Sequence, residues 1–209
     1  METKRFTLIT EADARVLEPG STIRLDRGGH VTPLAQETLR ARRITVIADD
    51  GGMVPEGLAP VAPVGRVAIG SDHSGFALKQ ALVPWLRSRG LAVEDVGVLA
   101  PEPADYPDIA AAVARRVARG EADAGVAIDA AGLGSAMAAN KIKGVRAAMA
   151  TSETLARYSR EHNGANVLTL GATLVDTDEA KRIVTRFLET PMREPRYIAR
   201  LAKIARLES

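Results

Sequence analysis

Residues 124–141 read AGVAIDAAGLGSAMAANK and carry the clearest structural signal in the chain. A short apolar run, Gly125–Ile128, meets the acid Asp129 and then the glycine-punctuated turn Ala130–Ser135, after which good helix formers continue to Asn140. This order predicts a strand, a tight turn and a helix N-terminus in succession. Such a junction directs unpaired backbone N–H groups and the positive end of the helix dipole at one point, where a phosphate or an oxyanion can bind.

Strand and helix patterns alternate along the chain from Arg66 onward. The predicted strands are Val67–Ile69, Leu91–Val96, Gly125–Ile128, Val145–Met149 and Val167–Leu170. Helical patterns follow them at about 76–90, 105–117, 132–140, 152–161 and 176–188, and a last helix covers about 196–207. Single helices between strands imply right-handed crossovers and a parallel sheet covered on both faces. In such sheets ligands bind beyond the carboxyl ends of the strands, so the residues that follow the first three strands are the candidates for chemistry.

A stretch rich in proline and glycine divides the chain. Residues 49–65 read DDGGMVPEGLAPVAPVG, with four glycines, three prolines and no sustained periodicity, and we predict a linker there. It separates a segment at 1–48 from a domain at 66–209. The segment is predicted to be a small α+β extension, too short to bury a large core by itself. Its expected elements are a helix starting at 10–13, a strand at 22–25, a helix at 33–42 and a strand at 44–47.

Composition limits the classes of function. The 209 residues are 46% hydrophobic and only 3% aromatic with a net charge of +2, which is typical of a soluble protein with an aliphatic core. No basic block with interleaved aromatics is present, so we expect no nucleic-acid partner. The lack of cysteine excludes disulfides, thiolate metal sites and a cysteine base. No signal-peptide core and no apolar run of roughly 18 residues is present, so we expect a cytoplasmic protein without a membrane partner.

Two acids follow predicted strands. Asp72 and His73 lie between two glycines in GSDHSG, residues 70–75, which favours a site at a strand-to-helix turn. The alternative is that Asp72 or Ser71 caps the next helix. The same two interpretations, a site residue or a helix cap, are open for Asp129.

Other polar candidates lie on predicted helices. His162 is at a helix C-terminus, where it is either a partner of the helix dipole or a group that transfers protons. Arg196, Arg200 and Lys203 share one helix face, which is either a solvated or salt-bridged face or a phosphate clamp. Tyr106, in the sequence DYP, is a helix-start residue on its local pattern.

Six motifs match a known family in the right order. They are GSDHSGF at 70–76, DYP at 105–107, GLG at 132–134 with AANK at 138–141, GVRAA at 144–148, SREHN at 159–163 and ANVL at 165–168. Residues 66–207 therefore resemble the type B ribose-5-phosphate isomerase and galactose-6-phosphate isomerase family. The resemblance implies a doubly wound, Rossmann-like five-stranded sheet with no metal and no organic cofactor. It also implies a homodimer or a tetramer whose active sites are shared between subunits.

The family's reaction is aldose–ketose isomerisation of a phosphorylated sugar through an enediolate. The resemblance implies that His162 opens the sugar ring and that backbone N–H groups of the loop from Gly132 through Gly134 to Ser135 steady the enediolate. Substrate-binding roles are implied for the remaining matched residues: Asp72 and Tyr106 for hydroxyls, Asn163 beside His162, and His73, Arg196 and Arg200 for the phosphate.

Five positions depart from the family pattern. Many members have a cysteine base at Asp129, and others have a glutamate at Ser135; a small hydroxyl residue is usual at Ala131, an arginine at Thr173 and a histidine at Tyr197. Since a carboxylate can carry out enediolate chemistry, the leading hypothesis is an isomerase with Asp129 as the base. The alternatives are a non-catalytic sugar-phosphate-binding or scaffolding homologue, and an isomerase for an unphosphorylated or smaller substrate.

The N-terminal segment carries a second resemblance. Its motifs ITEADAR at 9–15, IRL at 23–25 and VTPLA at 31–35 resemble a short module on enzymes tied to bacterial microcompartments, such as the ethanolamine-utilisation cobalamin adenosyltransferases. The resemblance implies that residues 1–48 bind a shell or cargo protein and target the chain to a microcompartment. An inert extension is the alternative.

Overall fold

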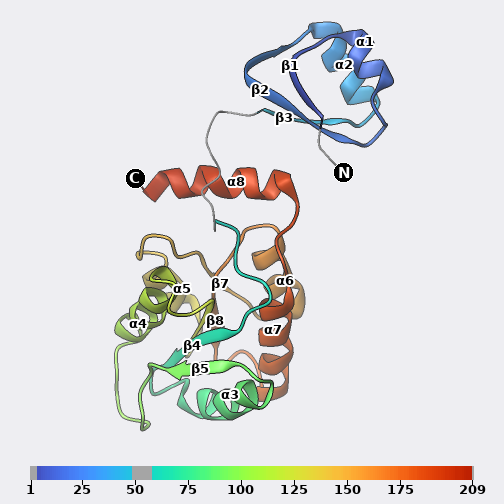
Figure 1. The fold of residues 1–209 in the computed structure, drawn as a ribbon. Coiled ribbons are helices and arrows are strands. Elements are labelled where there is room, and N and C mark those ends of the chain that lie inside the picture. Colours follow the sequence, from blue (N-terminus) through green and yellow to red (C-terminus); the bar gives the residue numbers. More distant parts are fainter. Residues whose placement is uncertain (1–3, 49–57, 209) are drawn as a thin grey trace. The chain divides into compact units, whose positions relative to one another are not determined.

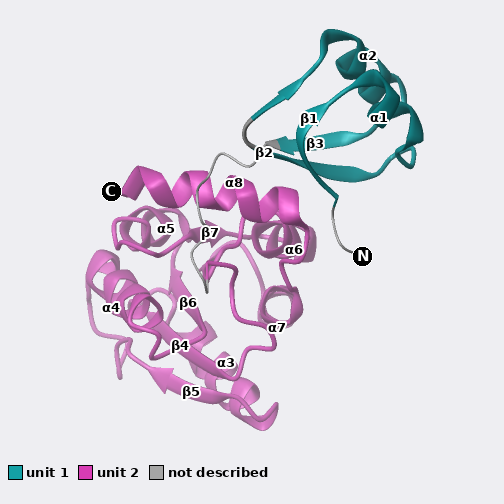
Figure 2. Ribbon diagram, turned by 45° about the horizontal axis from the view of Figure 1, so that its top comes forward, with its two compact units in different colours: residues 1–54 teal, residues 55–209 magenta. Residues whose placement is uncertain are grey.

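The computed structural model describes residues 4–48 and 58–208 and divides the chain into two compact units. Unit 1 covers residues 1–54 and unit 2 covers residues 55–209 (Figures 1 and 2). Residues 49–57 of the predicted linker lie outside the described residues. None of the described helices is long and apolar enough to cross a membrane.

Unit 2 is built on a five-stranded parallel sheet. Its strands are β4 (Arg66–Ser71), β5 (Ala92–Asp95), β6 (Ala124–Asp129), β7 (Ala147–Met149) and β8 (Val167–Gly171), in the order β5-β4-β6-β8-β7. The predicted five-stranded α/β fold is confirmed. The chain turns in opposite directions from β4 and β6, so the crevice between their carboxyl ends is the topological switch point at which such folds bind ligands.

Helices cover both faces of this sheet (Figure 2). On one face lie α4 (Tyr106–Ala118) and α5 (Leu133–Ala139); on the other lie α3 (Phe76–Ser88), α6 (Glu153–Glu161) and α7 (Thr177–Glu189). The chain continues with α8 (Pro195–Ala205) and a 3₁₀ turn, η1 (Arg206–Glu208). All six predicted helices are present, with ends that differ by a few residues.

Local chemistry explains these elements. Every residue of β6 is buried, as expected for a strand covered on both faces. Gly125 allows α4 to approach β6, because a Cβ atom there would lie 2.6 Å from Val113 Cγ1. Asp176 caps α7, since its carboxylate accepts a hydrogen bond of 2.8 Å from Glu179 N.

Unit 1 is a small β-α-β-α-β unit with a core of its own. Its elements are β1 (Arg5–Ile9), α1 (Glu11–Val16), β2 (Thr22–Val31), α2 (Pro33–Ala41) and β3 (Thr45–Ala48), and the strands are parallel in the order β1-β2-β3. β1 was not predicted from the sequence, and the strand predicted at 22–25 is longer than expected, since β2 continues to Val31. Eight apolar residues form the buried cluster: Ile9, Ala14, Leu17, Ile23, Leu25, Ala35, Leu39 and Ile44.

Candidate active site

Asp129 ends β6, and its buried carboxylate closes the glycine loop. One oxygen accepts hydrogen bonds from Ala131 N at 2.8 Å and from Gly132 N. The other accepts from Ser135 N at 3.0 Å and from Ser135 Oγ at 2.5 Å. The side chain therefore binds the loop and the start of α5, which agrees with the prediction of a helix cap. It also lies at the carboxyl end of β6, where a site residue was predicted.

The four hydrogen bonds limit the chemistry that Asp129 can perform as it stands. A carboxylate has about four lone-pair sites, and here each holds a donor. The N–H groups of Gly132 and Ser135, expected to face an enediolate, donate to Asp129 instead. To accept a proton from a substrate, Asp129 must release one donor. The Ser135 hydroxyl can turn away about a single bond, whereas the backbone N–H groups are fixed by the loop.

Tyr106 lies directly on the glycine loop. A Cβ atom on Gly134 would lie 2.5 Å from the Cε2 and Cζ atoms of Tyr106 and 2.9 Å from its hydroxyl oxygen. Only glycine leaves room for the ring at this distance. Tyr106 is the first residue of α4, so its predicted position at a helix start is correct, and the fold brings it to the loop.

Asp72 and His73 follow β4 at the same edge of the sheet. One oxygen of the buried Asp72 carboxylate accepts from Ser74 N, Ser74 Oγ and Gly75 N at 2.9, 2.6 and 3.1 Å. Its other oxygen has no hydrogen-bond partner among the described residues, which leaves it available to a ligand. The predicted helix cap is wrong in detail, because α3 has no side-chain cap and Asp72 closes the turn before it. The exposed His73 accepts a hydrogen bond of 3.4 Å from Ala104 N through Nδ1.

These side chains meet because their strands are neighbours. Ser71 of β4 is in register with Ile128 of β6, and Asp72 N donates to Ile128 O at 3.2 Å. We call the group at this edge the carboxyl-edge cluster; its members are Asp72, His73, Tyr106, Asp129, Gly132, Gly134 and Ser135. Thr173 binds the backbone of the loop, since its hydroxyl donates to Ala130 O at 2.7 Å. It therefore supports the loop and contributes no positive charge.

A second group surrounds His162, the residue that ends α6. The imidazole stacks on Tyr158 with ring centroids 4.6 Å apart, and it contacts the ring of Tyr197 on α8 at 4.4 Å. The guanidinium groups of Arg196 and Arg200 lie over the Tyr197 ring at 4.8 and 5.9 Å, and Arg196 donates to the Tyr197 hydroxyl at 3.0 Å.

We call this second group the amino-edge cluster; its members are Tyr158, His162, Asn163, Arg196, Tyr197 and Arg200. Asn163 belongs to it through the hydrogen bond of 3.1 Å from its Nδ2 to Tyr158 O. Tyr158 was not predicted as a site residue, although its position four residues before His162 places the two on the same helix face.

The two clusters lie at opposite ends of β8. Asp129 is in register with Gly171, the last residue of that strand, whereas the turn that contains His162 comes just before Val167, the first. The four residue steps of the strand separate these ends by about 13 Å. One chain therefore brings the predicted site residues together in two groups, and it does not join His162 to Asp129.

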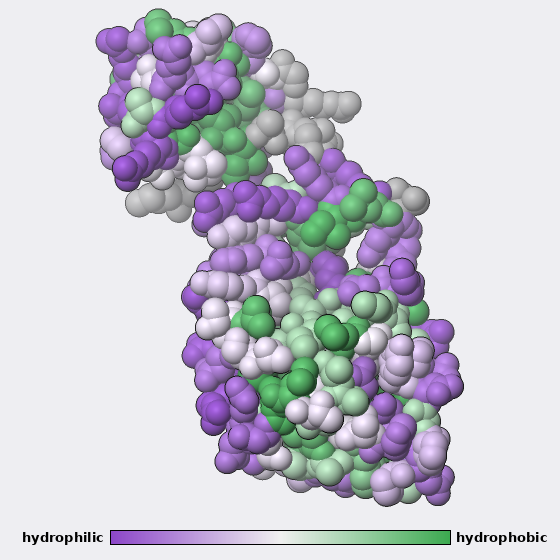
Figure 3. Space-filling view, turned by 180° about the vertical axis from the view of Figure 1, so that it is seen from behind, coloured by the Kyte–Doolittle hydropathy of each residue, from purple (hydrophilic) through white to green (hydrophobic). Residues whose placement is uncertain are grey.

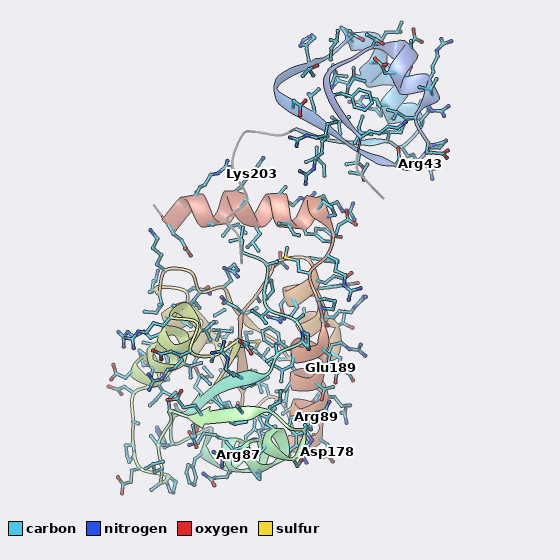
Figure 4. All side chains as sticks on the ribbon, in the orientation of Figure 1. Arg43, Arg87, Arg89, Asp178, Glu189 and Lys203 are labelled. Carbon is cyan, nitrogen blue, oxygen red and sulfur yellow. The ribbon has the colours of Figure 1, made fainter. Side chains whose placement is uncertain are left out.

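A cleft of about 570 Å³ lies at the amino end of the sheet, away from Asp129. Its walls include Trp85 of α3, Arg89 just after that helix, Glu189 of α7, and residues 60 and 62–64. Arg89 and Glu189 form an ion pair of 2.7 Å across it (Figure 4). The carboxyl-edge cluster is the better candidate for catalysis, because ligands of parallel sheets bind at the carboxyl ends of the strands.

A family model described as Ribose/Galactose Isomerase matches residues 67–204. The chain belongs to this family. Ribose-5-phosphate isomerase B of Escherichia coli is 40% identical to it over 143 residues, which are 68% of this chain and 96% of that protein. Among ribose/galactose isomerase structures, ribose-5-phosphate isomerase B of Clostridium thermocellum is 43% identical with a TM-score of 0.67, over 68% of this chain and 97% of the other. That of Thermotoga maritima is 39% identical with a TM-score of 0.66, over 68% and 98%.

The family match covers the sheet and helices of unit 2. It begins at Val67, so residues 1–66 lie outside it. The roles implied for residues 1–48 remain predictions.

Proposed function

We propose that the protein is an aldose–ketose isomerase that acts on a phosphorylated pentose or a related sugar phosphate through an enediolate. The similarity to ribose-5-phosphate isomerase B over nearly the whole length of the relatives supports a sugar-phosphate isomerase. The observation that carries the proposal is the carboxyl-edge cluster. The Asp129 carboxylate and the ring of Tyr106 contact the glycine loop, and Asp72 follows the neighbouring strand at the switch point of the sheet.

In the proposed mechanism, Asp129 moves a proton between C1 and C2 of the open-chain sugar. The Ser135 hydroxyl turns away from Asp129 when the substrate binds, and the oxygen that it leaves accepts the proton. The N–H groups of Leu133 and Gly134 have no acceptor in the described part of the chain, and they donate to the developing oxyanion. The free oxygen of Asp72 and the hydroxyl of Tyr106 bind substrate hydroxyls.

We propose that the site is completed in a homodimer. His162 opens the ring, and Arg196 and Arg200 hold the phosphate together with His73. Because the two clusters of one chain lie at opposite ends of β8, the amino-edge cluster of one protomer serves the carboxyl-edge cluster of its partner. Two apolar side chains of α5 beside the glycine loop, Leu133 and Met137, are exposed although the helix packs on the sheet, and they support a contact there. Apolar residues also gather on one face of unit 2 (Figure 3).

A second candidate function is a non-catalytic sugar-phosphate-binding or scaffolding homologue. The observation that favours it is the occupation of Asp129 by four donors, which is the arrangement of a structural anchor. In that case, ligands bind at the carboxyl-edge cluster and no proton moves between carbons.

Proton exchange distinguishes the two candidates. The protein is incubated in deuterated water with a panel of aldose and ketose phosphates, and NMR detects deuterium at C1 or C2. An isomerase incorporates deuterium, and Asp129→Cys, which restores the base of many relatives, retains exchange while Asp129→Asn loses it. Absence of exchange in a protein that binds the same ligands favours the second candidate. Exchange at the full rate in Asp129→Asn overturns the role of Asp129.

For residues 1–48 we propose binding to a shell or cargo protein of a microcompartment, in a protein otherwise of cytoplasmic location. Support comes from the resemblance and from the separate core of unit 1. Deletion of residues 1–57 is expected to leave isomerisation intact and to abolish association with the partner. Retained association contradicts the proposal.

A further inference from the structure

Two arginines with no ion pair in the described residues lie beneath the turn that follows His162. Arg160, on the last turn of α6, is fully buried, and Arg146, just before β7, is partly buried. The charge of Glu208 favours the charged form of Arg146, but no carboxylate of the described segments acts on Arg160, and a buried cation of that kind requires other compensation. Burial, together with the nearby charge of Arg146, lowers the pKa of Arg160 to about 10, so the guanidinium stays charged at neutral pH.

Backbone carbonyl groups provide that compensation from two directions. On the side of the turn, Arg146 Nε donates to Gly164 O at 2.7 Å, and Arg160 Nη1 donates to Ala165 O at 2.9 Å. On the opposite side, Arg146 Nη2 donates to Leu58 O at 3.1 Å, and Arg160 Nη2 donates to Val61 O at 2.8 Å. Each arginine is therefore a bridge between the turn and the segment that enters unit 2.

We call residues 58–64 the strap. The sequence predicts them as the second half of the linker, yet they contact unit 2 through more than the two arginines. Val64 is buried in the core that includes Val67 of β4. The strap precedes the residues that match the family model, so its bridges to Arg146 and Arg160 are an addition to the family's matched region.

The turn is also held from the side of α8. Gly164 has φ +62°, and a Cβ atom there would lie 2.4 Å from Leu201 Cδ2 and 3.1 Å from Met192 Sδ. Leu201 and Met192 on one side of the turn and the two arginines on the other restrict its movement. The turn follows His162, whose ring stacks on that of Tyr158 and contacts that of Tyr197 at an angle of 40°.

We propose that the strap positions His162, acting through Arg146 and Arg160. The two arginines are positioning residues, and the strap, which lies at the start of unit 2, becomes part of the machinery for ring opening. When the strap carbonyls are lost, Arg146 Nη2 loses its acceptor, and Arg160 Nη2 becomes unpaired beside Arg160 Nε, which is already buried without a partner among the described residues. Each arginine then moves to satisfy these groups at the expense of the turn. The catalytic consequence rests on the proposed function, in which His162 opens the sugar ring.

The test uses the full-length chain and three variants. Arg146→Lys and Arg160→Lys keep the charge, but a single ammonium group cannot bridge the turn and the strap. Deletion of Ala59 and Pro60 leaves both arginines intact and shortens the strap by about 7 Å, so that Leu58 and Val61 cannot both reach their partners. Arg182→Lys, at an exposed arginine of α7, is the matched control.

Two readouts are measured on each variant. The first is the NMR chemical shift of the His162 imidazole protons, which the neighbouring rings of Tyr158 and Tyr197 displace from its ordinary value. The signals are assigned by their loss in His162→Gln. The second is the division of the rate loss between kcat and KM. We expect the three variants to lose the displaced shift and to lower kcat by about tenfold to a hundredfold with little change in KM. The control variant is expected to change neither.

Unchanged His162 shifts in all three variants overturn the positioning role, whatever the activity. Should one arginine variant fail to fold, the other arginine variant and the strap deletion still decide the question. If the wild-type protein isomerises no sugar phosphate and the shifts nevertheless move, the positioning of His162 is supported and the proposed function fails.

Discussion

The Ser135 side chain donates its hydroxyl proton to the Asp129 carboxylate at 2.5 Å, and the Ser135 backbone N–H donates to the same oxygen at 3.0 Å. The first bond can be broken by rotation of a side chain, and the second cannot. Of the four donors around Asp129, the Ser135 hydroxyl is thus the one that can leave. When it leaves, one oxygen of Asp129 is able to accept a proton from a substrate.

Ser135→Ala is expected to free one lone pair of Asp129 and to retain isomerisation. The variant keeps the backbone N–H of residue 135 and loses one buried hydrogen bond to a charged group, so stability falls by about 1.5–3 kcal/mol. Urea unfolding and the rate of deuterium incorporation are the measurements. A loss of isomerisation of more than about a hundredfold, some 2.7 kcal/mol in the barrier, would mean that the hydroxyl itself contacts the reacting atoms.

Asp129→Asn is expected to destabilise the loop as well as the chemistry. One of the two oxygens becomes an NH₂ group, which cannot accept the N–H donors that now face it, and a cost of about 2–4 kcal/mol is expected. An inactive Asp129→Asn variant therefore identifies Asp129 as the base only if its glycine loop remains folded. Tyr106 ring resonances, which report on the loop, provide that control, and a variant with displaced Tyr106 signals is not a test of the base.

Gly134→Ala is expected to displace Tyr106 from the loop. The added methyl group would lie 2.5 Å from the ring, which is closer than van der Waals contact allows. A raised KM is expected, because Tyr106 is proposed to bind a substrate hydroxyl. Steady-state kinetics of Gly134→Ala, Tyr106→Ala and the double variant measure the coupling. If the changes in KM free energy of the two single variants add up to that of the double variant, the contact between Gly134 and Tyr106 does not cause the raised KM.

The repeated α/β pattern of unit 2 was predictable because each element is long or apolar enough to show its period. β1 was missed because it is only five residues long, which is too short a run for the alternation of Phe6 and Leu8 with Arg5 and Thr7 to stand out. The length of β2 was missed because Gly28 and Gly29 are typical of a turn. In the fold they lie within the strand, where the pairing with β1 shifts register between Phe6 and Leu8.

Apart from Tyr158, the residues of the two clusters were named from the sequence, but the division of one chain's residues into two clusters was not predicted. Nothing in the spacing of His162 and Asp129 indicates that β8 holds them apart. The strap was interpreted as a linker because its composition is that of one. Two of its backbone carbonyl groups hold it in place by accepting hydrogen bonds from Arg146 and Arg160. Every residue has such a carbonyl group, so these contacts cannot be predicted from the residue types of the strap.

Asp123 is expected to stabilise unit 2 in a pH-dependent manner. Burial opposes ionisation of this carboxyl, but hydrogen bonds from Arg66 and from the N–H groups of Gly65 and Arg66 outweigh it and hold the pKa of Asp123 below the ordinary 3.8. A lowered pKa means that the stabilisation is complete above the ordinary value and is lost as the pH falls through the lowered one.

Asp123→Asn should therefore reduce stability at neutral pH, and the difference from wild type should narrow as the pH drops below about 4. Urea midpoints measured from pH 7 to pH 2.5 give the comparison. Asp178→Asn, at an exposed carboxylate of α7, is the control and should show no such convergence. A difference that is constant over this range would show that the charge of Asp123 has no part in the stabilisation.

Mixed dimers test whether the two clusters meet between protomers. Asp129→Asn inactivates the carboxyl-edge cluster, and His162→Gln inactivates the amino-edge cluster. A homodimer of either variant therefore has two defective sites. A dimer with one protomer of each kind has one site with both defects and one site with neither. Random exchange makes half of the dimers mixed, so activity should recover to about one quarter of wild type. Exchange is followed by mass spectrometry of differently tagged chains. If tagged mixed dimers form and remain inactive, both clusters act within one chain or the assignment of one of them is wrong.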